Sequence, residues 1–184
     1  MTGYLEIMKQ RILAGFLGLA LLASFARAGE PGLNRPLEPF RITTLSGHEI
    51  TSATQRGRIL VVNLWATWCG PCRTEMPEIE AFFQKYRNRG VDVVAVSLDD
   101  RRESAAVRRF MAPFSVPVAL AADSDLRGFG RIRYLPATFV IDRDGLLKRS
   151  GWQQPASVDL PELEKALSPL LDAPADSPVV RSGG

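Results

Sequence analysis

The sequence predicts an α/β domain built on a mixed β-sheet with flanking helices. Two apolar runs, residues 59–65 and 91–98, enclose a segment whose apolar residues recur at helical spacing, which is typical of two buried strands joined by a crossover helix. Because such a connection joins parallel strands, we expect these two runs to lie parallel in one sheet. Residues 138–141 and 146–152 flank a turn at 142–145, which predicts an antiparallel hairpin. The combination of parallel and antiparallel pairs indicates a mixed sheet.

The remaining elements complete one domain, which we expect to span residues 39–172. Residues 29–38 are rich in Gly and Pro and are interpreted as an extended lead-in. Residues 40–51 alternate around Ser46-Gly47, which predicts a small hairpin. The crossover helix is expected at residues 72–87, and its apolar positions are Met76, Ile79, Phe82, Phe83 and Tyr86.

The second half of the chain contains two further predicted helices, at residues 103–110 and 160–171. The stretch between the second strand and the later hairpin is long enough to form an insertion. Residues 173–184 are rich in Pro, Ala, Ser and Gly and have little to bury, so we expect a disordered tail. A length of 184 residues fits one domain with appendages, and the chain has no internal repeat.

The first 28 residues have the features of a secretory signal peptide. Lys9 and Arg11 precede an uncharged apolar run at residues 12–26. The run ends in Ala26-Arg27-Ala28, which has the small-x-small pattern of a signal-peptide cleavage site. A run of this length is short for a membrane span, so cleavage is favoured over an uncleaved anchor at residues 12–26. Either alternative places the domain outside the inner membrane, which predicts a periplasmic protein.

The charge balance does not favour a nucleic-acid partner. The chain carries 23 Lys and Arg against 20 Asp and Glu, and residues 1–28 hold three of the basic and one of the acidic residues, which leaves 20 against 19. A nearly neutral domain has no electrostatic footprint for nucleic acid.

Cys69 and Cys72 are the two cysteines of the chain, and their spacing allows three interpretations. A structural zinc site needs four ligands, and His48 is the chain's only histidine. A stapling disulfide across two intervening residues would close almost no loop. A reactive pair is favoured, because Cys69 stands where a buried strand meets a helix and Pro71 suits the first helical turn. The free N–H groups of a helix start stabilise a thiolate, so we expect Cys69 to attack and Cys72, one turn later, to resolve.

The sequence around the cysteines resembles a known family. Trp68-Cys-Gly-Pro-Cys72 is the thioredoxin active-site sequence between a strand and a helix. The longer stretch VNLWATWCGPCRTEMP, residues 62–77, resembles the TlpA/ResA/DsbE group of exported thioredoxin-like proteins, and YLPATFVIDRDG, residues 134–145, resembles that group's second signature. The resemblance covers roughly residues 38–172. It implies a thioredoxin-like fold and a redox-active disulfide that works without a cofactor or a metal.

The same resemblance implies a substrate-binding role for Leu135 and Pro136. In thioredoxin-like proteins the proline that matches Pro136 is cis and lies against the cysteine pair, and the backbone that matches Leu135 pairs with the substrate. The residues by themselves predict an ordinary turn, since only about 5–6% of X–Pro bonds in folded proteins are cis. Trp68, next to Cys69, is expected to contact the substrate.

The group that handles protons is left open between two acids. Thioredoxin has a buried Asp in the strand before the cysteines, whereas this chain has Asn63, which cannot take a proton. The resemblance implies an acid elsewhere. Alignment of the second strand places Asp100 there, with Asp99 beside it, although aspartates before a helix are also favoured as caps. Glu75 matches the family motif and either tunes the cysteine pair or is simply an acid favoured by the helix dipole.

The function predicted from this resemblance is that of an exported reductant of protein disulfides. It implies a disulfide-containing exported protein as substrate, such as apocytochrome c or a copper-site protein, and a membrane thiol–disulfide shuttle as electron donor. Cytochrome c maturation and cell redox homeostasis are the implied processes. A disulfide-forming oxidase would carry Pro-His between the cysteines and a larger insertion than residues 101–136, and a peroxiredoxin would need Thr-x-x-Cys. A copper-delivery or adaptor module would need more His or Met ligands than His48 and four Met.

Overall fold

The computed structural model describes residues 30–153 and 157–172, and its centre is a five-stranded mixed sheet. The strand order is β5-β4-β3-β6-β7. The central strand β3 runs parallel to β4 and antiparallel to β6. Strand β5 extends the parallel side and β7 the antiparallel side, so the predicted mixed sheet is confirmed. The bounds are β3 Ile59–Trp65, β4 Val91–Ser97, β5 Val118–Leu120, β6 Ala137–Ile141 and β7 Leu147–Arg149.

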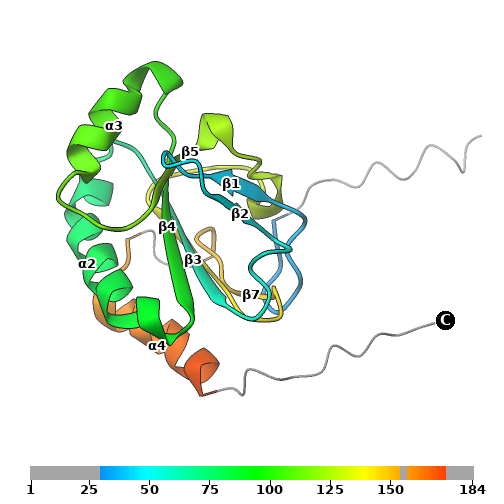
Figure 1. Cartoon of the computed structure of the whole chain (residues 1–184). Coiled ribbons are helices and arrows are strands. Elements are labelled where there is room, and N and C mark those ends of the chain that lie inside the picture. The colour runs from blue at the N-terminus through cyan, green and yellow to red at the C-terminus, as the bar shows by residue number, and fades with distance from the viewer. Residues whose placement is uncertain (1–29, 154–156, 173–184) are drawn as a thin grey trace, which may run out of the picture.

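Three helices cover one face of this sheet (Figure 1). They are α2 Gly70–Tyr86, α3 Ser104–Met111 and α4 Leu160–Leu171. The crossover helix begins two residues before the predicted start, because Pro71 occupies the first turn and the Cys69 side chain caps it. The bounds of α4 agree with the prediction, since Asp159 caps its start and buried Leu163 and Leu167 lie four residues apart.

A small antiparallel sheet and the long connection between β5 and β6 cover the face of the central sheet opposite the helices. Strands β1 Arg41–Thr43 and β2 Glu49–Thr51 form the predicted N-terminal hairpin. Beside them, Phe129 from the connection packs against Phe40 and Phe139, with ring centroids 5.1 and 5.2 Å apart, respectively. The indole N–H of Trp152 donates a hydrogen bond to the Phe129 carbonyl at 2.7 Å. The connection is therefore fixed to the sheet at an aromatic cluster.

Both faces of β3 are covered, which explains its continuous apolar sequence. Ile59, Val61 and Trp65 belong to the core under the helices. The alternate residues Leu60, Val62 and Leu64 belong to the core on the hairpin side. A strand that is buried on both faces needs apolar residues at every position, and Asn63 is the exception on the helix side.

Two details of the sheet differ from the prediction. The strand expected at residues 146–152 ends at Arg149, because the chain turns at Ser150, whose carbonyl accepts a hydrogen bond from the Gln153 N–H at 3.1 Å. Strand β5 was not predicted. It has three residues, too few for a periodic pattern, and it is placed by its parallel pairing with β4. Together with α3 and short 3₁₀ turns, β5 makes up the expected insertion.

The predicted leader, residues 1–28, and the predicted tail, residues 173–184, lie outside the described residues. The described part of the lead-in runs beside β7, where the Asn34 N–H donates to the Leu147 carbonyl at 2.7 Å. Within residues 30–153 and 157–172, no helix has the length and apolar character needed to span a bilayer.

Replacement of Gly151 by alanine is expected to destabilise the domain. A Cβ at this position would lie 2.8 Å from the Cβ of Ala137 and 2.8 Å from the backbone nitrogen of Thr138. Backbone cannot move aside as a flexible side chain can, so we expect a loss of roughly 1–3 kcal/mol in the free energy of unfolding. Urea denaturation measures the loss. Gly70→Ala is the control, because its new methyl group meets nothing within 4 Å. Equal urea midpoints of unfolding for Gly151→Ala and Gly70→Ala would contradict the predicted clash.

Candidate active site

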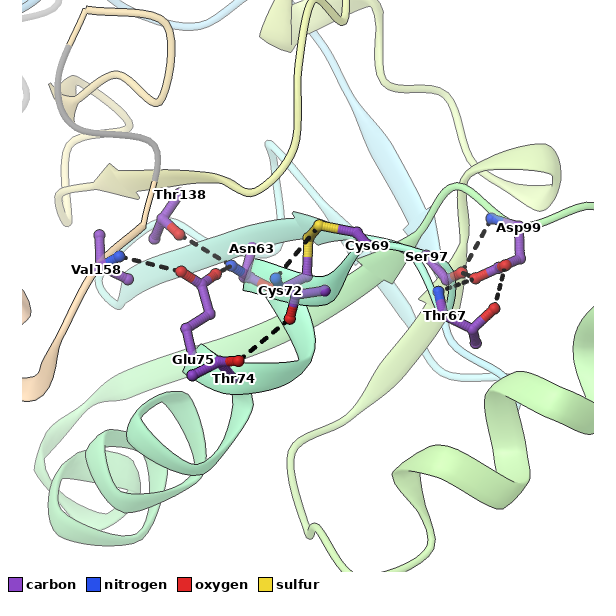
Figure 2. Close-up of a disulfide and its surroundings, with 11 residues drawn as sticks. Asn63, Thr67, Cys69, Cys72, Thr74, Glu75, Ser97, Asp99, Thr138 and Val158 are labelled. Carbon is purple, nitrogen blue, oxygen red and sulfur yellow. Dashed lines mark hydrogen bonds between the residues drawn. A yellow bond between two sulfur atoms is a disulfide. The ribbon is translucent and has the colours of Figure 1, made fainter.

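The two cysteines form a disulfide at the start of α2 (Figure 2). The sulfurs are 2.01 Å apart, and the Cys72 N–H donates to the Cys69 sulfur at 3.3 Å. Cys69 is 6% exposed and Cys72 is completely buried. An incoming sulfur can therefore reach Cys69 but not Cys72. The predicted placement between strand and helix is confirmed.

A buried aspartate braces the loop between β3 and the disulfide. The carboxylate of Asp99 accepts hydrogen bonds from the Thr67 N–H at 2.9 Å and the Thr67 hydroxyl at 2.6 Å (Figure 2). The Ser97 hydroxyl also donates to it, at 2.5 Å. These bonds connect the end of β4 to the residue two positions before Cys69. Asp99 thus holds the active-site loop in place.

Asp100 lies elsewhere and makes the contacts of a helix cap. Its side chain is exposed and accepts from the Arg102 N–H at 3.0 Å, while the Glu103 carboxylate accepts from the Asp100 N–H at 3.2 Å. This reciprocal pair is a capping box at the 3₁₀ turn before α3. Capping is one of the two interpretations that the sequence left open. A redox role for Asp100 stays a prediction that these contacts do not support.

A groove of about 470 Å³ opens beside the disulfide. Its lining is mostly apolar, and Trp68 at its edge is 68% exposed. Trp68 is one of the few large apolar side chains that are exposed among the described residues, and it lies next to Cys69. Sequence reasoning found Trp68 and Leu135 as substrate-binding residues but not the lining residues that only the fold brings to Cys69. These are Leu98, directly after β4, and Ile132, Arg133 and Tyr134, before the cis-proline.

The Leu135–Pro136 peptide is cis, as the resemblance implied. Leu135 lines the same groove as Cys69. The Tyr134 hydroxyl donates to the Gly151 carbonyl at 2.8 Å, and its ring meets Trp152 edge to face at 5.5 Å. The segment before β6 is therefore anchored to the turn after β7, which keeps Leu135 beside the cysteines.

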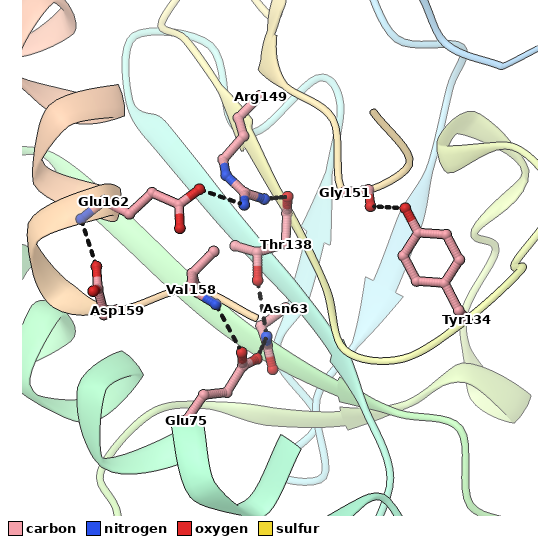
Figure 3. Close-up of polar contacts among 9 residues, drawn as sticks. All are labelled: Asn63, Glu75, Tyr134, Thr138, Arg149, Gly151, Val158, Asp159 and Glu162. Carbon is pink, nitrogen blue, oxygen red and sulfur yellow. Dashed lines mark hydrogen bonds and ion pairs between the residues drawn. The ribbon is translucent and has the colours of Figure 1, made fainter. Parts of the chain in front are cut away.

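Glu75 is a second buried acid of the site. It is 5% exposed and lies three residues after Cys72, one turn along α2. One carboxylate oxygen accepts from the Asn63 amide at 2.7 Å, and the other accepts from the Val158 N–H at 3.0 Å (Figure 3). Burial disfavours the charged form and raises the pKa of Glu75 to about 7, against the lowering effect of these hydrogen bonds. The side chain is therefore balanced between its two protonation states near neutral pH.

Asn63 connects Glu75 to the neighbouring strand. Its amide nitrogen also donates to the Thr138 hydroxyl at 3.0 Å, and Asn63 and Thr138 face each other in the β3–β6 register. The Asn63 carbonyl oxygen is buried and has no hydrogen-bond partner among the described residues. The predicted site residues Asn63 and Glu75 thus meet, but no sequence pattern indicated that Thr138 and Val158 would join them.

The described residues hold no group of three or more His, Cys, Asp or Glu side chains arranged to bind a metal ion. His48 lies in the exposed turn region of the β1–β2 hairpin. The site geometry is that of a paired-cysteine centre with a buried acid, Glu75, one helical turn after Cys72.

Comparison with known proteins agrees with this geometry. Residues 33–150 match the AhpC/TSA family. The thiol-disulfide oxidoreductase ResA of Bacillus cereus strain ZK / E33L is 31% identical over 137 residues, which cover 73% of this chain and 78% of that protein.

Solved structures share the fold. A thiol:disulfide interchange protein of the thioredoxin family from Chlorobium tepidum superposes with a TM-score of 0.64 at 24% identity, covering 78% of this chain and 99% of that one. StoA from Bacillus subtilis superposes with a TM-score of 0.59 at 20% identity, covering 72% of this chain and 98% of that one. The chain belongs to the AhpC/TSA family, has a thioredoxin-like fold and is a thiol–disulfide oxidoreductase.

Proposed function

We propose that this AhpC/TSA-family oxidoreductase is exported and reduces disulfides in exported protein partners. The observation that carries the proposal is a Cys-Gly-Pro-Cys pair in which Cys69 lines an apolar groove and Cys72 is completely buried. The basic and apolar leader supports a periplasmic location, with residues 12–26 as the tether if the leader is not cleaved. Apocytochrome c and copper-site proteins are the candidate substrates, and a membrane thiol–disulfide shuttle is the candidate electron donor.

The reaction begins with the reduced pair. The Cys69 thiolate attacks one sulfur of the substrate disulfide, a mixed disulfide forms, and the other substrate sulfur leaves as a thiolate that takes up a proton. Cys72 then loses its proton and attacks the Cys69 sulfur. The second substrate sulfur leaves and is protonated, and Cys69 and Cys72 end as the disulfide seen in the structure. Two electrons and two protons pass to the substrate, and the membrane shuttle restores the dithiol.

Glu75 takes the proton of Cys72 in this scheme. The two side chains are one helical turn apart, and a carboxyl group with a pKa of about 7 both accepts and returns a proton near neutral pH. Glu75 also lines a second pocket, between α2 and α4, which shares only Pro71 with the substrate groove. Proton exchange with solvent can proceed there while a substrate covers Cys69.

Asn63 suits an acid that changes its charge. An amide N–H donates to a carboxylate, and an amide carbonyl accepts from a carboxylic acid. When Glu75 is ionised, Asn63 donates to it as observed. When Glu75 is protonated, a rotated amide would place the unpartnered carbonyl oxygen of Asn63 opposite the new O–H. One side chain can thus serve both states.

The reduction potential tests the proposed direction. We expect a value close to about −270 mV, typical of a thioredoxin-like reductant, and the measurement is equilibration of the Cys69–Cys72 pair with defined dithiol–disulfide buffers. The reduced protein should then reduce a test protein disulfide. A value near about −120 mV would contradict the proposal and indicate a disulfide-forming oxidase. A Cys69→Ser/Cys72→Ser double variant is the control for reduction by the buffer alone.

A further inference from the structure

A buried arginine ends the strand next to β6. Arg149 is 1% exposed, and its guanidinium donates to the Thr138 carbonyl at 2.5 Å and to a Glu162 carboxylate oxygen at 3.1 Å (Figure 3). A buried charge is tolerated only with a counter-charge and hydrogen bonds. Glu162 on α4 provides the counter-charge, with its side chain 33% exposed.

The position of Arg149 follows from the end of β7. The strand stops opposite Val140, so no residue of β7 pairs with Thr138. The guanidinium donates to the Thr138 carbonyl in place of a strand partner. Arg149 therefore fixes the part of β6 that faces Asn63.

Hydrogen bonds on the two ends of Thr138 connect this ion pair to Glu75 (Figure 3). Arg149 holds the backbone of Thr138, the Thr138 hydroxyl accepts from Asn63, and Asn63 donates to Glu75. Three strands and two helices contribute to these contacts. A displacement of Thr138 would therefore move the Asn63 amide group, which donates a hydrogen bond to Glu75.

The ion pair also acts on Glu75 through its charges. Arg149 favours the ionised form of Glu75 and lowers its pKa, whereas Glu162 raises it, and both effects are smaller than that of burial. Glu78, on the same helix, and Asp159, before α4, line the pocket together with Glu75 and Glu162. The Glu78 carboxylate accepts from the Leu160 N–H at 3.2 Å, and that of Asp159 accepts from the Glu162 N–H at 2.8 Å. Glu78, Asp159 and Glu162 are all acids, and Arg149 provides the positive charge near Glu75.

We propose that the Arg149–Glu162 ion pair is a positioning device that holds Thr138 and Asn63 against Glu75 and sets how readily Glu75 accepts a proton. The inference rests on the proposed function only in that Glu75 handles the proton of Cys72. Arg149 and Glu162 touch neither sulfur, so they act through Glu75 and belong to the positioning residues of the site.

Glu162→Gln is the variant that tests the device. It keeps the size of the side chain and an oxygen that can accept from Arg149, and the cap of α4 is unaffected because the Glu162 backbone N–H forms it. Removal of the negative charge is expected to lower the pKa of Glu75 by roughly 0.5 unit. The measurement is an NMR titration of the labelled Glu75 carboxyl carbon in the oxidised protein, without substrate.

Glu164→Gln is the matched control. Glu164 lies on the same helix with 28% of its side chain exposed, and it pairs with Lys85 at 2.6 Å instead of Arg149. We expect the Glu75 titration of this variant to match the wild type. Equal titrations in the Glu162 and Glu164 variants would overturn the inference.

Substitution of Arg149 tests the other half of the pair. Arg149→Met is expected to raise the pKa of Glu75, and Arg149→Lys, which retains the positive charge, to restore much of the wild-type titration. If Arg149→Met fails to fold, the Glu75 titrations of Glu162→Gln and Arg149→Lys still test the proposal. A titration that shifts as expected without any change in the pH profile of disulfide exchange supports the device and contradicts the proton role of Glu75. The two proposals can therefore fail separately.

Discussion

A Cys69→Ser variant is expected to lose disulfide reduction by at least about a thousandfold, equivalent to about 4 kcal/mol in the activation barrier. Cys69 lines the substrate groove, whereas Cys72 is completely buried, so no other sulfur can make the first attack. A Cys72→Ser variant should lose multiple turnover as well, for a different reason. It still attacks the substrate but cannot resolve the mixed disulfide, so the covalent complex accumulates.

Two measurements separate these outcomes. Turnover is followed as reduction of a test protein disulfide, and covalent complexes are seen as bands on non-reducing gels that disappear when a dithiol is added. The Cys69→Ser/Cys72→Ser double variant is the control and should give neither. If Cys69→Ser traps complexes and Cys72→Ser does not, the roles of the two cysteines are reversed. Partners trapped in the exported fraction would also test the predicted location and substrates.

The fold was predictable where burial determines local sequence. Strand β3 is apolar throughout because both faces are covered, and α4 has a capping aspartate and regularly spaced leucines, so the sequence alone located both. The end of β7 and the existence of β5 were not predictable. Both depend on the pairing of segments that are distant in the chain.

The same distinction applies to the site. The cysteine pair and Trp68 are marked by a contiguous motif. The partners of Glu75 are not, because the Val158 N–H comes from a segment 83 residues away and Asn63 from the preceding strand. Asp99 and Asp100 show most clearly where prediction from the sequence ends. They are neighbours in the sequence, yet one carboxylate is buried against the active-site loop and the other caps an exposed turn. Only the direction of each side chain distinguishes them.

The stability of the protein is expected to fall between about pH 4.5 and 7 because of Glu75. The pKa of Glu75 is about 7 in the folded protein, against 4.5 as the reference for an unfolded chain. Between these values the unfolded chain releases the proton and the folded protein keeps it, so a rise in pH favours unfolding. The difference amounts to about 3 kcal/mol, which is present below the lower value and lost above the upper one.

Glu75→Gln should remove this dependence, because glutamine does not titrate. Urea denaturation of the oxidised protein at several pH values, compared between wild type and variant, measures the effect. Glu78→Gln, three residues along the same helix, is the control and should follow the wild type. The Glu75 variant is also expected to resolve mixed disulfides roughly 100-fold more slowly near neutral pH, since general-base assistance is lost. A wild-type stability profile that parallels that of the Glu75 variant would show that folding does not raise the pKa of Glu75, and an acid with an ordinary pKa holds almost no proton near neutral pH.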